Sequence, residues 1–330
     1  MFKNAIIYRI GAGWSATVED MEDALAQAPF IPCGATQEQS QGWVPPRGDK
    51  HTALVELVGG QRILRFTLES KSVPGSVVKR HLEERVAHIE ATTGRKPGRK
   101  ESRDLRDDVV HELLPMAFAK TSSVLVWLDL QAQLLVLDTA SQNKADAVTT
   151  ALTQACPGLH LSLLNTQVAP QAAMTQWLSG TPDNWPAHFA PGHEVELKST
   201  DAMQSVVKFT RHHLEDEEMR RHIAQGKLPT KLALDWEGRV GLVLTEGLQL
   251  KKISFLDTVF EGQAPDDQGF DTDVAIATGE LTKLIPDLVE ALGGEGRSVT
   301  GEAPAATPRG GAVTGPAQAP VDTDPDSAPF

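Results

Sequence analysis

The positively charged side chains between Arg95 and Arg106 are suited to binding phosphate groups. Six Lys and Arg residues stand here against two acidic ones, a local charge of about +4 in a chain of net charge −13 at pH 7. Gly94, Pro97 and Gly98 interrupt the run, so we expect no neutralisation by glutamates one helical turn away. Lysine and arginine contact phosphates without reading base sequence. The competing interpretation is a solvated basic surface without a ligand.

More cations elsewhere in the chain are candidates for the same side of the molecule. They are Lys79, Arg80, Lys208 and Arg211. Few aromatic residues accompany them, which disfavours stacking on unpaired bases and therefore specificity for single strands. The pattern favours contact with the phosphates of a duplex.

Acidic residues near the C-terminal end of the folded chain offer the main catalytic alternative. Carboxylates are ligands for Mg²⁺ and could support phosphodiester hydrolysis; the set is Asp266, Asp267, Asp271, Asp273 and Glu280. Such acids are more often a solvated loop. The spacing of the histidines does not match that of a metal site. The sequence motifs of nucleotide-binding proteins, hydrolases and metalloproteases are also missing. We expect no catalytic residues, no metal and no cofactor.

Two predicted helices position the basic cluster within residues 75–120. Apolar residues recur at spacings of three and four along each helix. The first helix carries Val78, Leu82, Val86 and Ile89, and the second carries Leu105, Val109 and Leu113. The glycines and proline between them exclude one continuous helix. The result is a helical hairpin with a basic tip.

The remaining pattern predicts an α+β fold with mixed sheets and packed helices, into which the hairpin is inserted. Four regions follow: a central domain (1–74 and 121–180), the hairpin (75–120), a C-terminal base domain (181–295) and a disordered tail (296–330). Four local expectations are a helix over 15–27 capped by Ser15, a rigid turn at 42–46, a joint at 181–192, and a strand at 273–277 followed by a helix from Gly279.

Composition is that of an ordinary soluble protein. The 330 residues are 40% hydrophobic and 23% charged, and no apolar run reaches the ~20 residues that span a bilayer. The first nine residues are too short and too charged for a signal peptide. The two cysteines, Cys33 and Cys156, are far apart. We therefore expect a cytoplasmic protein with reduced thiols and no membrane partner.

Phe118 follows Pro115, which should end or kink the second helix. An aromatic residue beyond such a break is either part of the core or an anchor for a partner subunit. The sequence leaves both open.

Several stretches together resemble the bacterial recombination-associated RdgC family. They occur in collinear order over about residues 1–295 and are Phe2–Asn4, Tyr8–Arg9, Phe30–Gly34, Gly42–Pro46, Leu113–Phe118, Thr230–Trp236 and Thr278–Glu295. The resemblance implies a non-enzymatic protein that binds duplex DNA, and single strands more weakly, with little sequence specificity. It further implies a ring-shaped homodimer with a positively charged hole, association with the nucleoid, and restraint of RecA-mediated strand exchange.

By position, this resemblance assigns the tip contacts to Arg95, Lys96, Arg99, Lys100 and Arg103. Lys208 and Arg211 match a second basic patch, thinned here by Phe209 and Thr210, and Phe118 lies near a subunit contact. The family can carry a basic residue where this chain has Met116.

The leading hypothesis is a homodimer that encircles duplex DNA through phosphate contacts. The first rival is a Mg²⁺-dependent phosphodiesterase or nuclease that uses Asp271, Asp273 and Glu280. The second is a scaffold whose basic tip meets an acidic protein rather than DNA.

Overall fold

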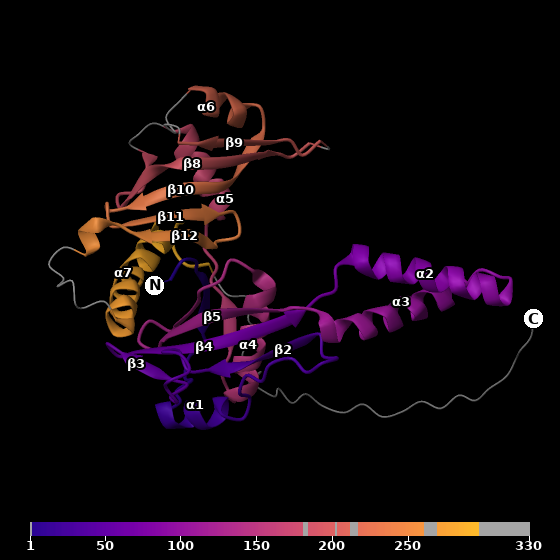
Figure 1. The fold of residues 1–330 in the computed structure, drawn as a ribbon. Coiled ribbons are helices and arrows are strands. Elements are labelled where there is room, and N and C mark those ends of the chain that lie inside the picture. The colour runs from indigo at the N-terminus through magenta and orange to yellow at the C-terminus, as the bar shows by residue number, and fades with distance from the viewer. Residues whose placement is uncertain (1, 181–183, 202, 212–216, 261–268, 297–330) are drawn as a thin grey trace, which may run out of the picture. The chain divides into compact units, whose positions relative to one another are not determined.

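The chain folds into two antiparallel β-sheets with helices packed against them (Figure 1). The computed structural model describes residues 2–180, 184–201, 203–211, 217–260 and 269–296. An α+β fold is confirmed, but the strand ladders of both sheets are antiparallel rather than mixed. The predicted tail lies outside the described residues, apart from Gly296, and the predicted division into domains stays a prediction.

The first sheet has the strand order β2–β4–β5–β6–β1–β7, with β3 paired to β4. Its strands are β1 (Ile6–Ile10), β2 (Gln39–Val44), β3 (Glu56–Val58), β4 (Gln61–Lys71), β5 (Ala119–Asp129), β6 (Leu134–Leu137) and β7 (Leu161–Leu163). One face is covered by α1 (Val18–Leu25) and α4 (Gln142–Ala155), which share a core with it.

The second sheet has the order β12–β11–β10–β8–β9. Its strands are β8 (Phe189–Ser199), β9 (Val206–Thr210), β10 (Lys227–Trp236), β11 (Val240–Thr245) and β12 (Leu250–Phe255). The helical elements of this half are α5 (Pro170–Ser179), α6 (Glu217–Ala224), the 3₁₀ turn η3 (Asp257–Val259) and α7 (Phe270–Ala291).

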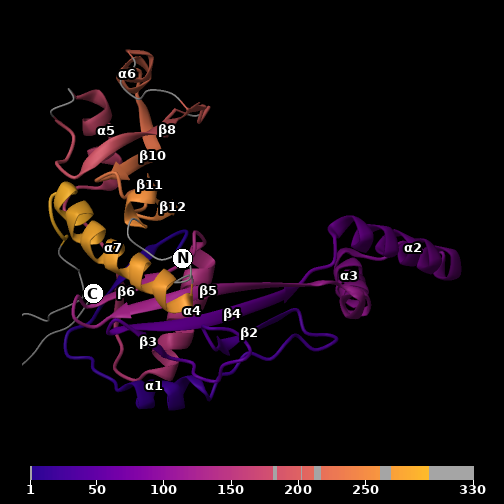
Figure 2. The ribbon, with the colours of Figure 1, turned by 60° about the vertical axis from the view of Figure 1, so that its left-hand side comes forward.

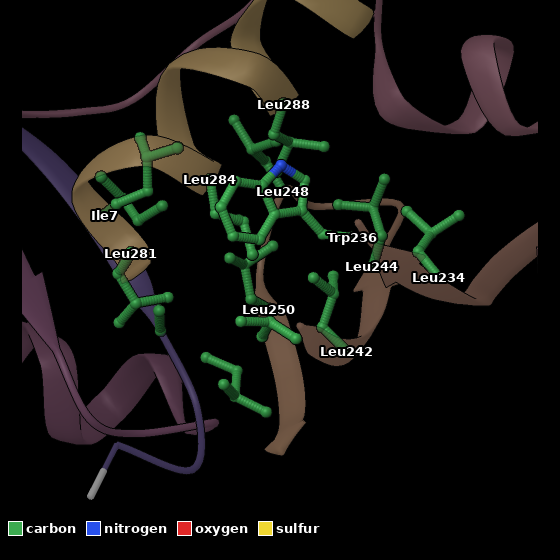
Figure 3. Packing of buried hydrophobic residues seen from close by; sticks show 14 of the residues in the cluster. Ile7, Leu234, Trp236, Leu242, Leu244, Leu248, Leu250, Leu281, Leu284 and Leu288 are labelled. Atoms are coloured by element: carbon green, nitrogen blue, oxygen red, sulfur yellow. The ribbon is translucent and has the colours of Figure 1, made fainter. Parts of the chain in front are cut away.

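The helix α7 joins the two sheets through one hydrophobic core. Its buried side chains include Leu281, Leu284 and Leu288, which pack with Ile7 of the first sheet and Trp236 of the second (Figure 3). In Figures 1 and 2 this helix lies between the sheets. A pair of backbone hydrogen bonds between Ala5 and Leu250, 2.8 and 3.0 Å long, adds a direct link.

The strand predicted at 273–277 is wrong, because these residues form the first half of α7. The buried residues Val274, Ala277 and Leu281 follow one another at spacings of three and four, so the helical stripe continues across the segment. A Cβ on Gly279 would meet no atom within 4 Å, so this glycine fits inside the helix without ending it.

The rigid turn predicted at 42–46 is also wrong in part, because β2 extends to Val44 and pairs with β4. Gly42 is required there by a close backbone approach, since a Cβ would lie 2.4 Å from the nitrogen of Phe30. The two prolines come only after the strand has ended.

Two element boundaries differ from the prediction. The first helix begins at Val18 and is capped by Thr17 rather than Ser15, because Thr17 and Asp20 form a reciprocal capping box with two 3.0 Å hydrogen bonds. The strand β8 begins at Phe189, inside the predicted joint, because its residues pair with β10 from that point.

Within the described residues, no helix has both the length and the apolar character needed to cross a bilayer.

Truncation of the central helix provides a stability test of this core. Leu284 is fully buried, so Leu284→Ala should lower the free energy of unfolding by about 2–5 kcal/mol. Urea denaturation followed by circular dichroism measures it. The neighbouring exposed residue provides the control, Lys283→Ala, which should change the free energy by less than about 0.5 kcal/mol. Equal effects of the two variants would contradict the burial of this face.

Candidate nucleic-acid interface

The basic cluster lies on two helices that follow one another between neighbouring strands. They are α2 (Gly75–Thr93) and α3 (Arg99–Leu113), with the short 3₁₀ turn η1 (Leu114–Met116) after them. Because Lys71 at the end of β4 pairs with Ala119 at the start of β5, both ends of the helical pair are attached at one place. Figures 1 and 2 show α2 and α3 side by side beyond the ends of these strands.

The turn between the helices is set by glycine and proline. Gly94 ends α2 in the left-handed conformation, with φ of 68°, which glycine adopts without steric cost. Pro97 follows, and Gly98 is the N-cap residue of α3. The segment therefore reverses the chain direction within a few residues, as its composition predicts.

The seam between α2 and α3 buries little apolar surface. Val78, Val109 and Leu114 are buried, whereas the other predicted apolar positions remain half-exposed. An ion pair between Arg85 and Glu112 joins the two helices. The pair is thus a slender element whose surface is mostly available to a partner.

Every predicted contact residue at the turn is exposed to solvent, but two of them are paired. Arg95 forms a 2.9 Å ion pair with Glu101, and Lys96 lies 3.8 Å from Glu90. The sequence argument considered only acids one helical turn away, whereas both of these partners are six residues away, across the turn. Both pairs are exposed, so each contributes little stability and can be exchanged for a phosphate.

The remaining three tip cations stand in the first turns of α3. Arg99, Lys100 and Arg103 are exposed, and no ion pair joins them to any described residue. A cation near a helix N-terminus opposes the helix dipole at a cost of about 0.3–1 kcal/mol. The same dipole attracts anions. The placement is unfavourable for the helix alone and favourable for a bound phosphate.

The other predicted cations on the helical pair lie at its opposite end. Lys79 and Arg80 are in the first turns of α2, roughly 20 Å along the helix axis from the tip at 1.5 Å per residue. Both are exposed, and Lys79 lies 3.8 Å from Glu83. Lys79 and Arg80 therefore do not cluster with the tip cations. A duplex lying along the helices would be long enough to contact the two groups.

The second basic patch is weaker than the sequence predicts. Lys208 on β9 forms a 2.9 Å ion pair with Glu196 of β8, and Lys231 of β10 binds the same carboxylate at 3.0 Å. Burial acts to raise the pKa of Glu196, but the hydrogen bonds from these two lysines outweigh it and lower the pKa to about 2. Lys208 thus shares one negative charge with Lys231, and the three side chains together keep a net charge of +1.

Arg211, the other member of this patch, follows β9 with an exposed side chain and a φ of 57°. Its left-handed backbone conformation is uncommon for a residue with a side chain. The sequence carries no signal for this geometry.

Phe118 is not part of the core. Its exposed fraction is 94%, and that of the neighbouring Met116 is 71%. This excludes the core interpretation that the sequence left open and leaves an apolar pair on the surface at the base of the helical pair.

Among the described residues, the acidic residues of the nuclease hypothesis form no group of three potential metal ligands. Glu280 is 6% exposed, and both its oxygens accept hydrogen bonds from Arg239 at 2.7 and 2.5 Å. Asp271 accepts hydrogen bonds from Arg47 at 3.1 and 2.5 Å. The hydrogen bonds from Arg239 lower the pKa of Glu280. Asp273 belongs to no group of three potential metal ligands within the described residues, and Asp266 and Asp267 lie outside them.

Comparisons with known proteins place these features in one family. A family described as "Putative exonuclease, RdgC" matches residues 1–295. The protein of Dechloromonas aromatica named "Recombination-associated protein RdgC" is 40% identical over 301 residues, which cover 89% of this chain and 98% of that protein. The proteins of that name in Herminiimonas arsenicoxydans and Cupriavidus necator are each 42% identical over 298 residues, with the same coverage.

Removal of the partner of Glu280 tests whether this carboxylate is structural. Arg239→Ala leaves a buried carboxylate unpaired and should cost about 3 kcal/mol, the lower end for buried pairs because Arg239 is about one-third exposed. Because the folded-state pKa of Glu280 is lowered, the pair stabilises the protein above the ordinary value of 4.5 and loses that effect at lower pH. Urea denaturation at pH 7 and pH 3.5 should show the difference from wild type shrinking with acid.

Arg220 is exposed and has no ion pair with any described residue, so it provides the matched control. Arg220→Ala should leave stability unchanged at both pH values. If Arg239→Ala has the same free energy of unfolding as wild type at pH 7, the ion pair does not stabilise the protein.

Proposed function

Because the chain belongs to the RdgC family of recombination-associated proteins, we propose that it binds duplex DNA without sequence preference and restrains RecA-mediated recombination. The observation that carries the proposal is the tip of the helical pair. There, exposed cations stand at the N-terminus of α3, where they weaken the helix and suit a phosphate.

The chemistry of the tip favours backbone contact over base reading. Between Gly75 and Ala117 the sequence contains no Phe, Trp or Tyr, so the helical pair offers no ring on which a base could stack. Lys and Arg contacts to phosphates give affinity that is independent of sequence. Duplex DNA is therefore the preferred ligand, and single strands bind more weakly.

Because the chain has a net charge of −13, cations that bind DNA must project away from its acidic surface. A polyanion is repelled by most of such a surface, so the cations act only where they project away from it. The long connection between β4 and β5 does this, because it carries the cations on helices beyond the ends of these strands.

A homodimer would complete the binding site. Phe118 and Met116 form an exposed apolar pair beside the attachment of the helices, and a fully exposed phenylalanine is a suitable anchor for a partner subunit. We propose that two copies close into a ring around the duplex, with the cations of α2 and α3 facing the hole.

Restraint of RecA then follows from occupancy. A ring on duplex DNA blocks access of a recombinase filament to that duplex without any bond being broken. The proposal also places the protein in the cytoplasm, on the nucleoid.

The family description favours a second candidate, an exonuclease. The paired states of Asp271 and Glu280 give it no support among the described residues. Incubation of linear duplex with the protein and Mg²⁺ separates the two functions. Intact DNA is expected, whereas shortening that is lost in Asp273→Ala would favour the exonuclease.

Charge removal at the tip tests the proposed interface. Changing Arg95, Lys96, Arg99 and Lys100 together to Ala should weaken duplex binding by on the order of 100-fold near 100 mM salt. It should also reduce the slope of log affinity against log salt by up to about four, one per lost phosphate contact. Fluorescence anisotropy with two unrelated duplex sequences measures both quantities.

A control variant removes the same number of positive charges outside the helical pair, by changing Lys3, Lys50, Lys144 and Lys251 to Ala. It should bind almost as tightly as wild type, which separates local contact from overall charge. If the tip variant binds as well as wild type, the tip is a solvated surface and the interface is wrongly placed.

A further inference from the structure

Three potential metal ligands meet at the end of the second sheet that faces α7. His188 precedes β8, Glu237 lies in the turn between β10 and β11, and Asp287 is on α7. The Nδ1 atom of His188 is 2.8 Å from an Oε1 of Glu237. One ligand atom from each residue lies within 4.8 Å of the other two. Three segments far apart in sequence thus converge on one point.

Neighbouring groups hold the side chain of Asp287 and the backbones of His188 and Glu237 in place. The indole Nε1 of Trp236 donates a 2.8 Å hydrogen bond to one carboxylate oxygen of Asp287, which leaves the other oxygen available. The backbone nitrogen of Glu237 donates to the carbonyl oxygen of His188 at 3.1 Å. Supporting hydrogen bonds of this kind hold first ligands in place around metal ions.

The backbone of the turn contributes as well. Glu237 has a φ of 52°, in the left-handed region, and is followed by Gly238 with a φ of 64°. The nitrogen of Gly238 donates a 2.6 Å hydrogen bond to Asp235. The turn is therefore held in one shape, and Glu237 is held beside His188.

We propose that His188, Glu237 and Asp287 form a binding site for a divalent transition-metal ion of the Zn²⁺ class. One imidazole and two carboxylates are ligands that Zn²⁺ accepts at about 2.0–2.2 Å. Ligand atoms at that radius in a tetrahedron lie about 3.4 Å apart. Side-chain rotations that move the ligand atoms by about an ångström are therefore enough to coordinate the ion. The ion would replace the hydrogen bond between His188 and Glu237.

The surroundings provide room for water and further negative charge. His188 and Asp287 line a pocket of about 330 Å³ together with Glu290. Glu290 is three residues from Asp287 on α7 and so lies on the same helix face. Water can occupy the fourth position, and Glu290 adds negative charge to the pocket lining.

The electrostatic field at this point already favours a cation. The carboxylates of Glu237 and Asp287 both lie beside the imidazole of His188. The presence of an imidazole ligand separates this site from a Mg²⁺ site, because Mg²⁺ prefers oxygen ligands in octahedral geometry. The site is distinct from the cations of the proposed DNA interface and does not depend on that function.

Isothermal titration of Zn²⁺ into the metal-free full-length chain tests the site. Wild type should bind one equivalent more tightly than His188→Ala or Glu237→Gln, each of which should weaken that equivalent at least tenfold. Zn²⁺ should also raise the melting temperature of wild type and not of these variants. Mg²⁺ at the same concentration should have no effect.

His51 provides the matched control, because it is an exposed histidine outside the cluster. His51→Ala should bind Zn²⁺ as wild type does, which separates this site from weak binding by other histidines. Equal Zn²⁺ binding by wild type, His188→Ala and Glu237→Gln would overturn the proposal and leave an ordinary ion pair. Circular dichroism of the metal-free variants shows that each is folded.

Discussion

Burial of α7 between the two sheets is the constraint on which the rest of the structure depends. Leu281, Leu284 and Leu288 place apolar surface against strands of both sheets, and Trp236 packs in the same core and donates a hydrogen bond to Asp287 of this helix. The first sheet is covered on its other face by α1 and α4. With both faces buried, β4 and β5 are fixed in register, and the helices between them project from a rigid base.

The projecting helices show the opposite balance of forces. They bury few side chains, and the N-terminus of α3 carries cations that oppose its dipole. Local stability is thus lower where a polyanion is proposed to bind, a common feature of functional surfaces. Ion pairs also occur in the second sheet, where Glu196 binds Lys208 and Lys231, and between this sheet and α7, where Arg239 binds Glu280. Arg99, Lys100 and Arg103 have no ion pair to any described residue, which supports the tip as the main DNA contact.

The sequence predicts the helical pair and its turn well, because periodicity and the Gly94, Pro97 and Gly98 signals act over short distances. It fails where partners meet only in the fold. The pairing of Lys208 with Glu196 depends on the register of β8 and β9, which no local pattern specifies. Within the first half of α7, Val274 and Ile276 alternate with alanines, so this short segment also fits a strand until its buried face is known. His188, Glu237 and Asp287 likewise meet only because the fold brings distant segments together, so the sequence does not predict their cluster.

The measurement that tests the proposed ring most directly compares closed circular with linear duplex DNA. The protein is bound at low salt to a closed circle, the salt is raised until phosphate contacts are screened, and the DNA is then recovered with or without a single restriction cut. A closed dimer around the duplex predicts protein retained on the circle and released once the DNA is cut. Release to the same extent from circular and linear DNA would contradict encirclement and leave binding from one side only.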